Sequence, residues 1–471
     1  MSIDTGKKTE VSIESPLAHL SEETIEQLAK EFDAIHDEVY ADLGERDRNY
    51  ITTVIAAQRQ LAVAGRVILF GSKSRTAWVA GTACLGVAKI LENMEIGHNV
   101  MHGQWDWMND PDIHSSVWDW DTASTAEAWK HSHNYVHHTY TNIRGKDKDL
   151  GYEIMRIDPN QPWSPVYLAQ PFYNLLLMAF FEWGVALHDL DIEAIRKGEK
   201  PMKDLLTDLR GIGTKARRQI VKDYIGWPAV SALAYGAVQV VSGGRVSGGG
   251  KSKLGARLRS LSSSKATNSV AKVLDKHGAG IERTFVATVT ADFVANIIRN
   301  LWSHGIIFCG HFPDQAYTFS KEETENETRG GWYVRQLVGA ANIEGSSLFH
   351  LMSGNLSYQV EHHLYPDMPS TRYKEVAPKI KDICERYQLP YNSGPLMKQW
   401  GSVQRTIIRL AFPGGKMAPK PGPYRGERVG GSSSKPSEAA RFRNRVPAGH
   451  PDSGPEHNGG GVEAKLPPRG E

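Results

Sequence analysis

The chain has 471 residues, of which 55 are lysine or arginine and 53 are aspartate or glutamate, so its formal net charge is only +2. This balance excludes a nucleic-acid-binding protein that depends on overall positive charge. The 3 cysteines, Cys84, Cys309 and Cys384, are too few and too scattered for a disulfide framework or a thiolate cluster. Any metal site must therefore be built mainly from histidine.

The chain begins with a polar segment, residues 1–20, which lacks the apolar core of a signal peptide and is predicted to be disordered. Ser21 then caps a predicted amphipathic helix, whose apolar residues recur at helical spacing: Ile25, Leu28, Phe32, Ile35 and Val39. The polar face of this helix is acidic. That favours a helix lying on the body of the protein over one lying on a membrane surface.

Five apolar segments follow. Residues 53–70 and 76–91 are short and interrupted by charges, and they predict either a helical hairpin in a bilayer or buried core helices. Residues 163–187, 225–242 and 284–310 each reach the length of about 20 residues that a transmembrane helix needs. Tryptophan and tyrosine lie at the ends of these runs, as they often do at membrane interfaces. We expect an all-α integral membrane protein with about four transmembrane helices.

The remaining segments are polar. Residues 196–222 are rich in lysine and arginine, and residues 243–265 form an insert of glycine, serine, lysine and arginine. Proline, glycine and basic residues dominate from 412 to 471, which predicts a disordered tail. One domain is therefore expected over residues 21–411.

The chain has 18 histidines, and many of them gather in three clusters. The first cluster is His98 and His102, and the second is the run from His131 to His138. The third is the pair His362 and His363, which comes three residues after Gln359. Imidazole is a good ligand for iron, zinc, copper and nickel. Together the clusters offer enough nitrogen donors for two metal ions. On a helix, residues 133 and 137 share one face, so both are expected to reach one ion.

The three clusters resemble the histidine boxes of the membrane fatty acid desaturases. The matching motifs are His98-x-x-x-His102, His133-x-x-x-His137-His138 and Gln359-x-x-His362-His363. The surroundings match as well: Trp129, Thr141-Asn142, and the run Ser-Gly-Asn-Leu-Ser-Tyr before Gln359. The context of His98 and the run Gly310-His311-Phe312-Pro313 are similar to actinobacterial acyl-CoA desaturases of the stearoyl-CoA delta-9 type. The resemblance covers roughly residues 20–400.

This resemblance implies a centre of two iron ions. The implied ligands are His98, His102, His133, His137, His138, His311, Gln359, His362 and His363. His304, which stands four residues after Asn300, is an alternate to His311, with Asn300 beside it. His131 falls outside the box pattern, and His114, His188 and His350 are expected to be ordinary histidines. The candidate carboxylates for orienting the imidazoles are Asp106, Asp110, Asp119, Asp147, Asp149 and Glu361.

The implied activity is an O2-dependent desaturation that introduces a cis double bond into a saturated acyl chain. The expected substrate is an acyl-CoA, with stearoyl-CoA and delta-9 chemistry favoured, and a lipid-bound acyl chain is the alternative. Other readings of the same histidines are a membrane hydroxylase or ketolase, a bis-histidine haem protein, and a structural zinc protein. The chain shows no flavin, nicotinamide, iron–sulfur or haem motif. A separate electron donor is therefore implied, namely an NADPH-dependent reductase, a ferredoxin or a cytochrome.

Topology adds a further expectation, because one metal site cannot be assembled from both sides of a bilayer. An even number of spans must lie between the second and third boxes. Residues 163–187 contain Pro165, Pro171 and Glu182, so this run is expected to remain outside the bilayer. Residues 224–242 and 284–303 then form the crossing pair. The boxes would lie in a helical cap on the cytoplasmic side of the cell membrane.

Overall fold

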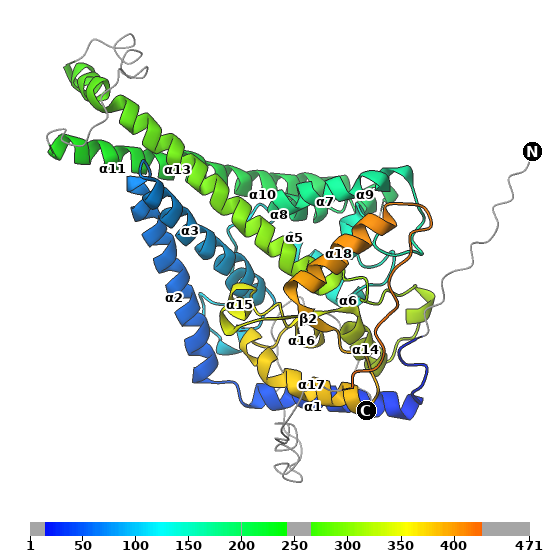
Figure 1. Cartoon of the computed structure of the whole chain (residues 1–471). Coiled ribbons are helices and arrows are strands. Elements are labelled where there is room, and N and C mark those ends of the chain that lie inside the picture. Colours follow the sequence, from blue (N-terminus) through cyan, green and yellow to red (C-terminus); the bar gives the residue numbers. More distant parts are fainter. Residues whose placement is uncertain (1–14, 199, 243–264, 426–471) are drawn as a thin grey trace, which may run out of the picture.

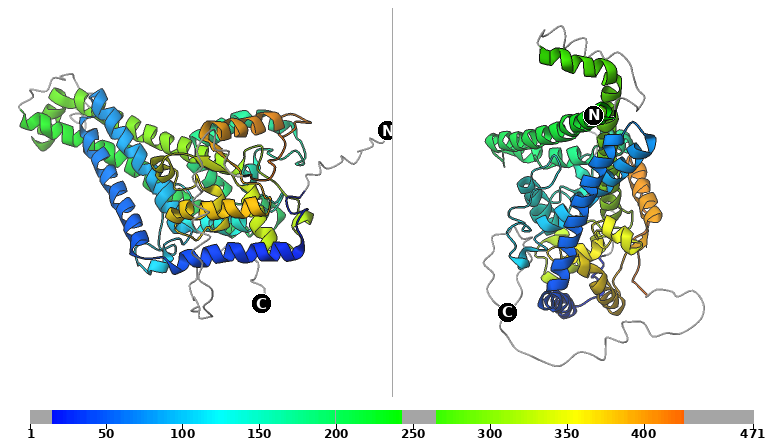
Figure 2. Two further views of the ribbon diagram at one scale, coloured as in Figure 1. Left: turned by 60° about the horizontal axis from the view of Figure 1, so that its bottom comes forward. Right: turned by 90° about the vertical axis from the view of Figure 1, so that its left-hand side faces the viewer.

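The computed structural model describes residues 15–198, 200–242 and 265–425. Most of the segments predicted to be disordered, and most of the predicted insert near 243–265, lie outside these ranges. The described chain is mainly helical. Figure 1 shows a wide body from which helices converge toward one narrow end, and the left view of Figure 2 shows the same narrowing.

The four converging helices are α2 (Glu45–Ile68), α3 (Arg75–Leu91), α11 (Trp227–Val241) and α13 (Lys265–His311). The predicted hairpin is therefore formed by α2 and α3, with α2 beginning earlier than its apolar run. The apolar run 284–310 is the C-terminal part of α13, which is 47 residues long. Its polar N-terminal half could not be recognised from hydropathy alone.

Small residues let α2 and α3 approach closely. A Cβ atom on Gly65 would lie 3.1 Å from the carbonyl oxygen of Gly81, and a Cβ atom on Gly81 would lie 3.1 Å from the carbonyl oxygen of Gly65. Such glycine contacts are typical of helices that pack within a membrane. The turn between α2 and α3 also reaches α11, because Lys73 Nζ donates to the Tyr235 hydroxyl at 3.0 Å.

Two stretches of the described chain, residues 45–71 and 202–241, are long and apolar enough to cross a bilayer. The run 163–187 does not form one helix. It divides into a short 3-10 turn (Pro165–Ala169), α7 (Gln170–Ala179) and α8 (Phe181–His188). The break falls at Phe180, whose φ of −117° and ψ of 36° are not helical. None of these pieces approaches the length of a span.

A cluster of charged side chains is buried among the four long helices. Arg66 on α2 donates to Asp223 at 2.9 Å and also pairs with Asp292 on α13. Lys89 on α3 donates to the other oxygen of Asp223 at 2.8 Å. All four side chains are buried. Charges in such surroundings are stable only when they are paired, so this cluster joins α2, α3 and α13 to the π-helical turn Val221–Gly226 that leads into α11.

The predicted first helix is confirmed as α1 (Glu22–Ala41), with Ser21 accepting a hydrogen bond from the Thr24 backbone N–H at 3.2 Å. Its apolar face, including Leu28 and Phe32, is buried against the body. The partners of α1 include α14 (Arg329–Gly339) and α17 (Tyr373–Arg386). The interpretation of a helix lying on the protein is therefore correct.

The other helices are short, apart from α10 and α18. They are α4 (Asn99–Met101), α5 (Ala126–Trp129), α6 (His138–Tyr140), α9 (Ile192–Lys197), α10 (Met202–Ile220), α15 (Ser347–Met352), α16 (Gln359–Leu364) and α18 (Leu396–Leu410). Two short parallel strands, β1 (Asn342–Glu344) and β2 (Ser393–Pro395), add a small sheet. The histidine boxes lie where the inner ends of α3 and α13 enter this body.

Candidate metal centre

The first two histidine clusters begin in π-helical segments, Glu92–His98 and Lys130–His137. In a π-helix the backbone hydrogen bonds run from residue i to residue i+5, so each turn contains more residues than an α-helical turn. Such turns are rare and concentrate at functional sites. The third cluster lies on α16, and His311 is the last residue of α13. Four separate parts of the chain thus supply the histidines.

The structure brings the predicted histidines into two adjoining groups. The first group has its ligating nitrogens within 4.8 Å of one another and consists of His98, His102, His133 and His362. The second group meets the same limit and consists of His137, His311 and His363. Neither group can be recognised in the sequence, since each draws on three of the four segments.

His138 lies between the two groups. Its ring centroid is 4.8 Å from that of His102 and 4.7 Å from that of His363. His133 and His137 stack side by side at 5.0 Å, as expected for residues one turn apart. They belong to different groups of histidines, but together with Asp149 they form a third set whose ligand atoms also lie within 4.8 Å of one another, so the expectation that both can reach one ion stays a prediction.

The free nitrogens of these imidazoles fit a metal centre. Nε2 is buried and has no hydrogen-bond partner within the described residues for five of them: His102, His133, His137, His362 and His363. Both nitrogens of His138 are also buried and have no hydrogen-bond partner within the described residues. A buried polar atom without a partner is rare and destabilising in a folded protein. So many in one place indicate that a ligand absent from the protein chain completes the site.

The opposite nitrogens are held by the protein. His137 Nδ1 lies 3.0 Å from Asp147 Oδ1, and His133 Nδ1 lies 3.2 Å from Asp149 Oδ2. Asp149 also accepts from His188 Nε2 at 2.9 Å. A metal-bound histidine usually donates its second N–H to a carboxylate or carbonyl, which fixes the ring orientation. The predicted roles of Asp147 and Asp149 match this arrangement.

Burial sets the charge of the cluster. Desolvation, together with the neighbouring imidazoles of His133 and His137, lowers the pKa of His98 to about 3. The pKa values of His138 and His363 lie well below the usual value for the same reasons. His188 differs: burial alone would lower its pKa, but Asp149 outweighs burial and raises it to about 9. Most of the cluster is therefore neutral imidazole, the form that binds a metal.

The structure separates His311 from its alternate. His311 lies in the second group, 4.9 Å from both His137 and His363 between ring centroids. The amide Nε2 of Gln359 is 3.2 Å from His311 Nε2, and Gln359 Oε1 has no partner in the described chain. His304 instead bonds to Asn174 at 3.0 Å and stacks on Phe308. Asn300 donates to the Ala179 carbonyl, so neither alternate is in the cluster.

The other candidate carboxylates, and the histidines outside the boxes that remain, contact residues outside the histidine cluster. Asp106 bonds to Ser115, Asp110 to Arg48 and Asp119 to Lys215, and Glu361 accepts from Asn342 and Tyr391. His131 is exposed and stacks on Tyr135. His114 bonds to Ser116, and His350 bonds to Ser357.

Three orienting contacts could not be found by sequence reasoning. His98 Nδ1 lies 3.0 Å from Asn99 Oδ1, His362 Nδ1 lies 3.1 Å from the Tyr373 hydroxyl, and His363 Nδ1 lies 3.0 Å from Gln336 Oε1. His188, expected to be ordinary, contacts Asp149 and hence acts on His133. Polar residues of these types are common, and nothing in their spacing marks them as partners of a histidine.

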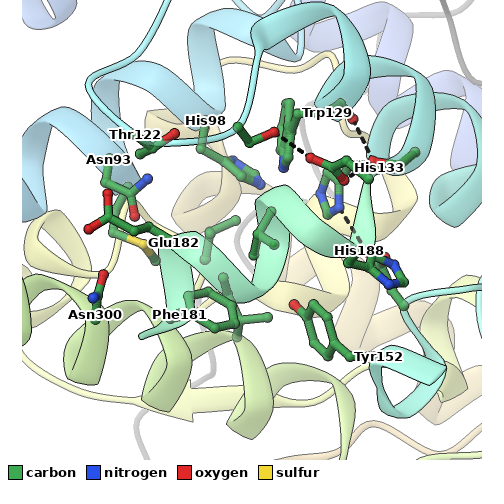
Figure 3. Close-up of a pocket in the computed structure, with 18 of the residues that line it drawn as sticks. Asn93, His98, Thr122, Trp129, His133, Tyr152, Phe181, Glu182, His188 and Asn300 are labelled. Carbon is green, nitrogen blue, oxygen red and sulfur yellow. Dashed lines mark hydrogen bonds and ion pairs between the residues drawn. The ribbon is translucent and has the colours of Figure 1, made fainter. Parts of the chain in front are cut away.

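A cavity adjoins the histidine cluster (Figure 3). His98 and His133 lie on one side of it, and His311 also lines it. Aromatic and apolar side chains form much of the remaining wall, among them Trp129, Tyr152, Phe181 and Val185. Trp129 stacks on His133 with 4.6 Å between ring centroids. A mostly apolar space beside a polar reactive centre fits a substrate whose reacting part is hydrocarbon.

Comparisons with known proteins agree with this arrangement. A family model described as fatty acid desaturase matches residues 76–246 and 280–395. The NADPH-dependent stearoyl-CoA 9-desaturase of Mycobacterium tuberculosis is 44% identical over 396 residues, which cover 84% of this chain and 82% of the relative. The sn-1 linoleoyl-lipid 6-desaturase of Synechocystis sp. is 24% identical over 384 residues, which cover 77% of this chain and 89% of that relative. No solved structure matches the chain.

Proposed function

Because the chain belongs to the fatty acid desaturase family, we propose that it inserts a cis double bond at the delta-9 position of a saturated acyl-CoA. As a member of this family, the protein is an oxidoreductase that desaturates acyl chains. The preference for an acyl-CoA over a lipid-bound chain rests on the 44% identical relative, which is named as a stearoyl-CoA 9-desaturase. The lipid-acting relative is only 24% identical.

The observation that carries this proposal is the double group of imidazoles beside an apolar cavity: most of them are neutral, and five have a buried Nε2 without a partner in the described chain. We assign one iron to the group His98, His102, His133 and His362, and a second to His137, His311 and His363. His138 is the remaining imidazole ligand, and Gln359 lies beside His311 at the second iron. When bound, the two irons supply the O2-dependent oxidising chemistry that removes two hydrogens from adjacent carbons.

The protein's own contribution is to orient the ligands. Asp147 and Asp149 hold the Nδ1 sides of His137 and His133, so that the Nε2 sides face inward. Tyr373 and Gln336 do the same for His362 and His363. Fixing these rings before the metal arrives removes most of the ordering entropy from metal binding.

The cavity positions the substrate and excludes water. Phe181, Val185 and Tyr152 present apolar surface to a hydrocarbon chain, and burial of that chain favours binding by about 0.8 kcal/mol for each methylene group. A chain held against this wall places one pair of carbons next to His98, His133 and His311. The depth to which the acyl chain can enter the cavity then decides which pair of carbons is desaturated.

The electrons for each turnover come from a separate protein. The named relative is NADPH-dependent, which supports a reductase that oxidises NADPH and passes electrons to the metal centre, directly or through a ferredoxin or cytochrome. The described chain shows no fold of its own for a nicotinamide or flavin. The proposal therefore includes an external donor as an obligatory partner.

Fatty-acid profiling of a host tests this function. Expression of the wild-type chain with a suitable reductase is expected to produce monounsaturated acids two mass units lighter than their saturated precursors. The His137→Ala variant is expected to produce none above the host background, because His137 belongs to the second group. An unchanged profile from folded, iron-loaded wild-type protein would refute the assignment, and products heavier by one oxygen would indicate a hydroxylase.

We also propose four membrane spans, α2, α3, α11 and the C-terminal half of α13, with the remaining helices of residues 21–411 forming a cytoplasmic cap. The turn between α2 and α3 and the end of α11 lie at the narrow end of the molecule, far from α6 and α16, which carry histidines of the cluster (Figure 1). In whole cells, a cysteine at Ser74 is expected to react with an impermeant thiol reagent. A cysteine at Lys374, on α17 of the cap, is expected to react only after lysis. Labelling of both sites in intact cells would disprove this orientation.

A further inference from the structure

Helix α10 has one face packed against the body. Gln219 Nε2 donates to Glu182 Oε2 on α8 at 2.7 Å, and Lys215 Nζ donates to the Trp120 carbonyl at 2.8 Å. A Cβ atom on Gly211 would lie 2.9 Å from Thr125 Cγ2, so the helix also touches the cap of α5. These contacts fix which side of α10 faces outward.

The outward side carries an apolar stripe without a partner. Met202, Leu206, Leu209 and Ile220 are 59%, 50%, 43% and 45% exposed. At 100° per residue, these four positions fall on one side of the helix. Large apolar side chains gathered on one solvent-exposed face are unusual and mark an interaction site.

A row of cations runs beside this stripe. Lys203, Arg210 and Arg217 are exposed and stand seven residues apart, so they form one line along the helix. None of the three makes an ion pair within the described residues, unlike Lys215 on the packed side, which pairs with Asp119. Stripe and row are parallel and extend over nearly the whole of α10.

The neighbourhood of α10 points to a bilayer as the occupant. A π-helical turn, Val221–Gly226, joins α10 directly to α11 within the apolar stretch 202–241. A helix of 40 residues is about 60 Å long, roughly twice the thickness of the hydrocarbon core, so only part of this stretch can cross it. Figure 1 places α7 and α8 along the same edge of the molecule, and α7 exposes Phe172, Leu175 and Leu176.

We propose that α10 lies in the headgroup layer of the membrane and binds anionic phospholipid there. The apolar stripe enters the boundary between headgroups and acyl chains, and the row of Lys203, Arg210 and Arg217 binds lipid phosphates. An apolar stripe flanked by lysine and arginine is the pattern of a helix that lies in the membrane plane. An acidic protein partner would explain the cations but leaves the stripe without a function.

This surface is coupled to the reaction site through α8. Glu182 accepts the hydrogen bond from α10, and the same residue lines the cavity together with Phe181 and Val185. Trp120, whose carbonyl binds Lys215, also lines that cavity. Lipid bound at α10 therefore steadies one wall of the space in which the acyl chain is held. The proposal rests on neither the iron assignment nor the choice of acyl-CoA.

Hydrogen exchange of the full-length protein in lipid nanodiscs tests the proposal. Amides of residues 202–220 are expected to exchange more slowly as phosphatidylglycerol replaces phosphatidylcholine. The double variant Arg210→Gln/Arg217→Gln is expected to bind anionic lipid more weakly. For each charge removed, about fivefold more phosphatidylglycerol should be needed to slow exchange to the same extent. The matched control is Lys30→Gln/Lys374→Gln, which removes two exposed lysines from α1 and α17 and should respond as wild type does.

Three outcomes would overturn the proposal. The first is equal exchange of α10 in neutral and anionic nanodiscs. The second is equal behaviour of the α10 variant and the control variant. The third is protection of α10 that appears in neutral nanodiscs only after the reductase is added, which would make α10 a protein-docking surface instead.

Discussion

The His138→Ala variant is expected to lower desaturase activity by roughly a thousandfold or more, which corresponds to about 4 kcal/mol, and to reduce bound iron from about two ions per chain to one or fewer. His138 lies between the two groups of imidazoles, and neither of its nitrogens has a partner in the described chain. Its removal breaks no hydrogen bond of the apoprotein. The loss should therefore appear in metal binding and turnover while the unfolding temperature of the metal-free protein falls only modestly.

Matched histidines make this result specific. His131 lies in the same run but is exposed and stacks on Tyr135, so His131→Ala should retain both iron and activity. Replacing His311 should reproduce the loss seen for His138, whereas His304→Ala should keep the iron, because His304 bonds to Asn174 instead. Iron analysis and product mass measured on the same preparations check all four variants. Full iron and activity in His138→Ala would show that the two groups do not need it.

The sequence predicts which residues form the cluster better than it predicts how they are grouped. Boxes of fixed spacing identified the histidines, and the structure gathers all of the favoured ones, with His311 rather than His304. Spacing assumes an α-helix, in which residues 133 and 137 face one ion. The π-helical turns alter that register. His133 and His137 each join histidines from distant segments, and with Asp149 they also remain close enough to each other to share one ion.

Only some of the residues that orient the imidazoles could be predicted from the sequence. Asp147 and Asp149 were found because they follow the second box closely in the chain. Gln336 and Tyr373 are held against His363 and His362 by the packing of α14, α16 and α17, a long-range arrangement that no local pattern encodes. Short-range periodicity predicted α1, since burial of one helical face leaves a repeat in the sequence. The hairpin was predicted from its two apolar runs instead.

The apolar run 163–187 illustrates a different limit. Hydropathy alone could not distinguish a membrane span from exposed helices at an interface, because both are rich in leucine and phenylalanine. Pro165, Pro171 and Glu182 argued against a span, and the structure divides the run into α7 and α8. Three-dimensional exposure was needed to see that the apolar side chains of α7 face outward.

The second large effect is expected at the buried charges of the long helices. The Arg66→Met variant should destabilise the protein by about 3 to 5 kcal/mol, because it leaves buried carboxylates without their partner. Arg66 is the described partner of Asp292 and one of two strong partners of Asp223. Lys89 can still pair with Asp223, but Asp292 would be buried without its cation, and either keeping it charged or protonating it there costs free energy. Thermal unfolding in one detergent, with and without lipid, measures the loss.

Two controls show whether charge pairing is the cause. Arg59→Met removes an exposed cation from the same helix and should change stability by less than about 0.5 kcal/mol. The double variant Arg66→Met/Asp292→Leu removes both members of one pair and should recover much of the lost stability, since replacing a buried pair by apolar residues is often neutral. If Arg66→Met unfolds at the wild-type temperature, water must reach Asp292, and the cluster does not hold α2, α11 and α13 together. If instead the double variant is no better than Arg66→Met, the stabilisation comes from packing of the Arg66 stem rather than from its charge.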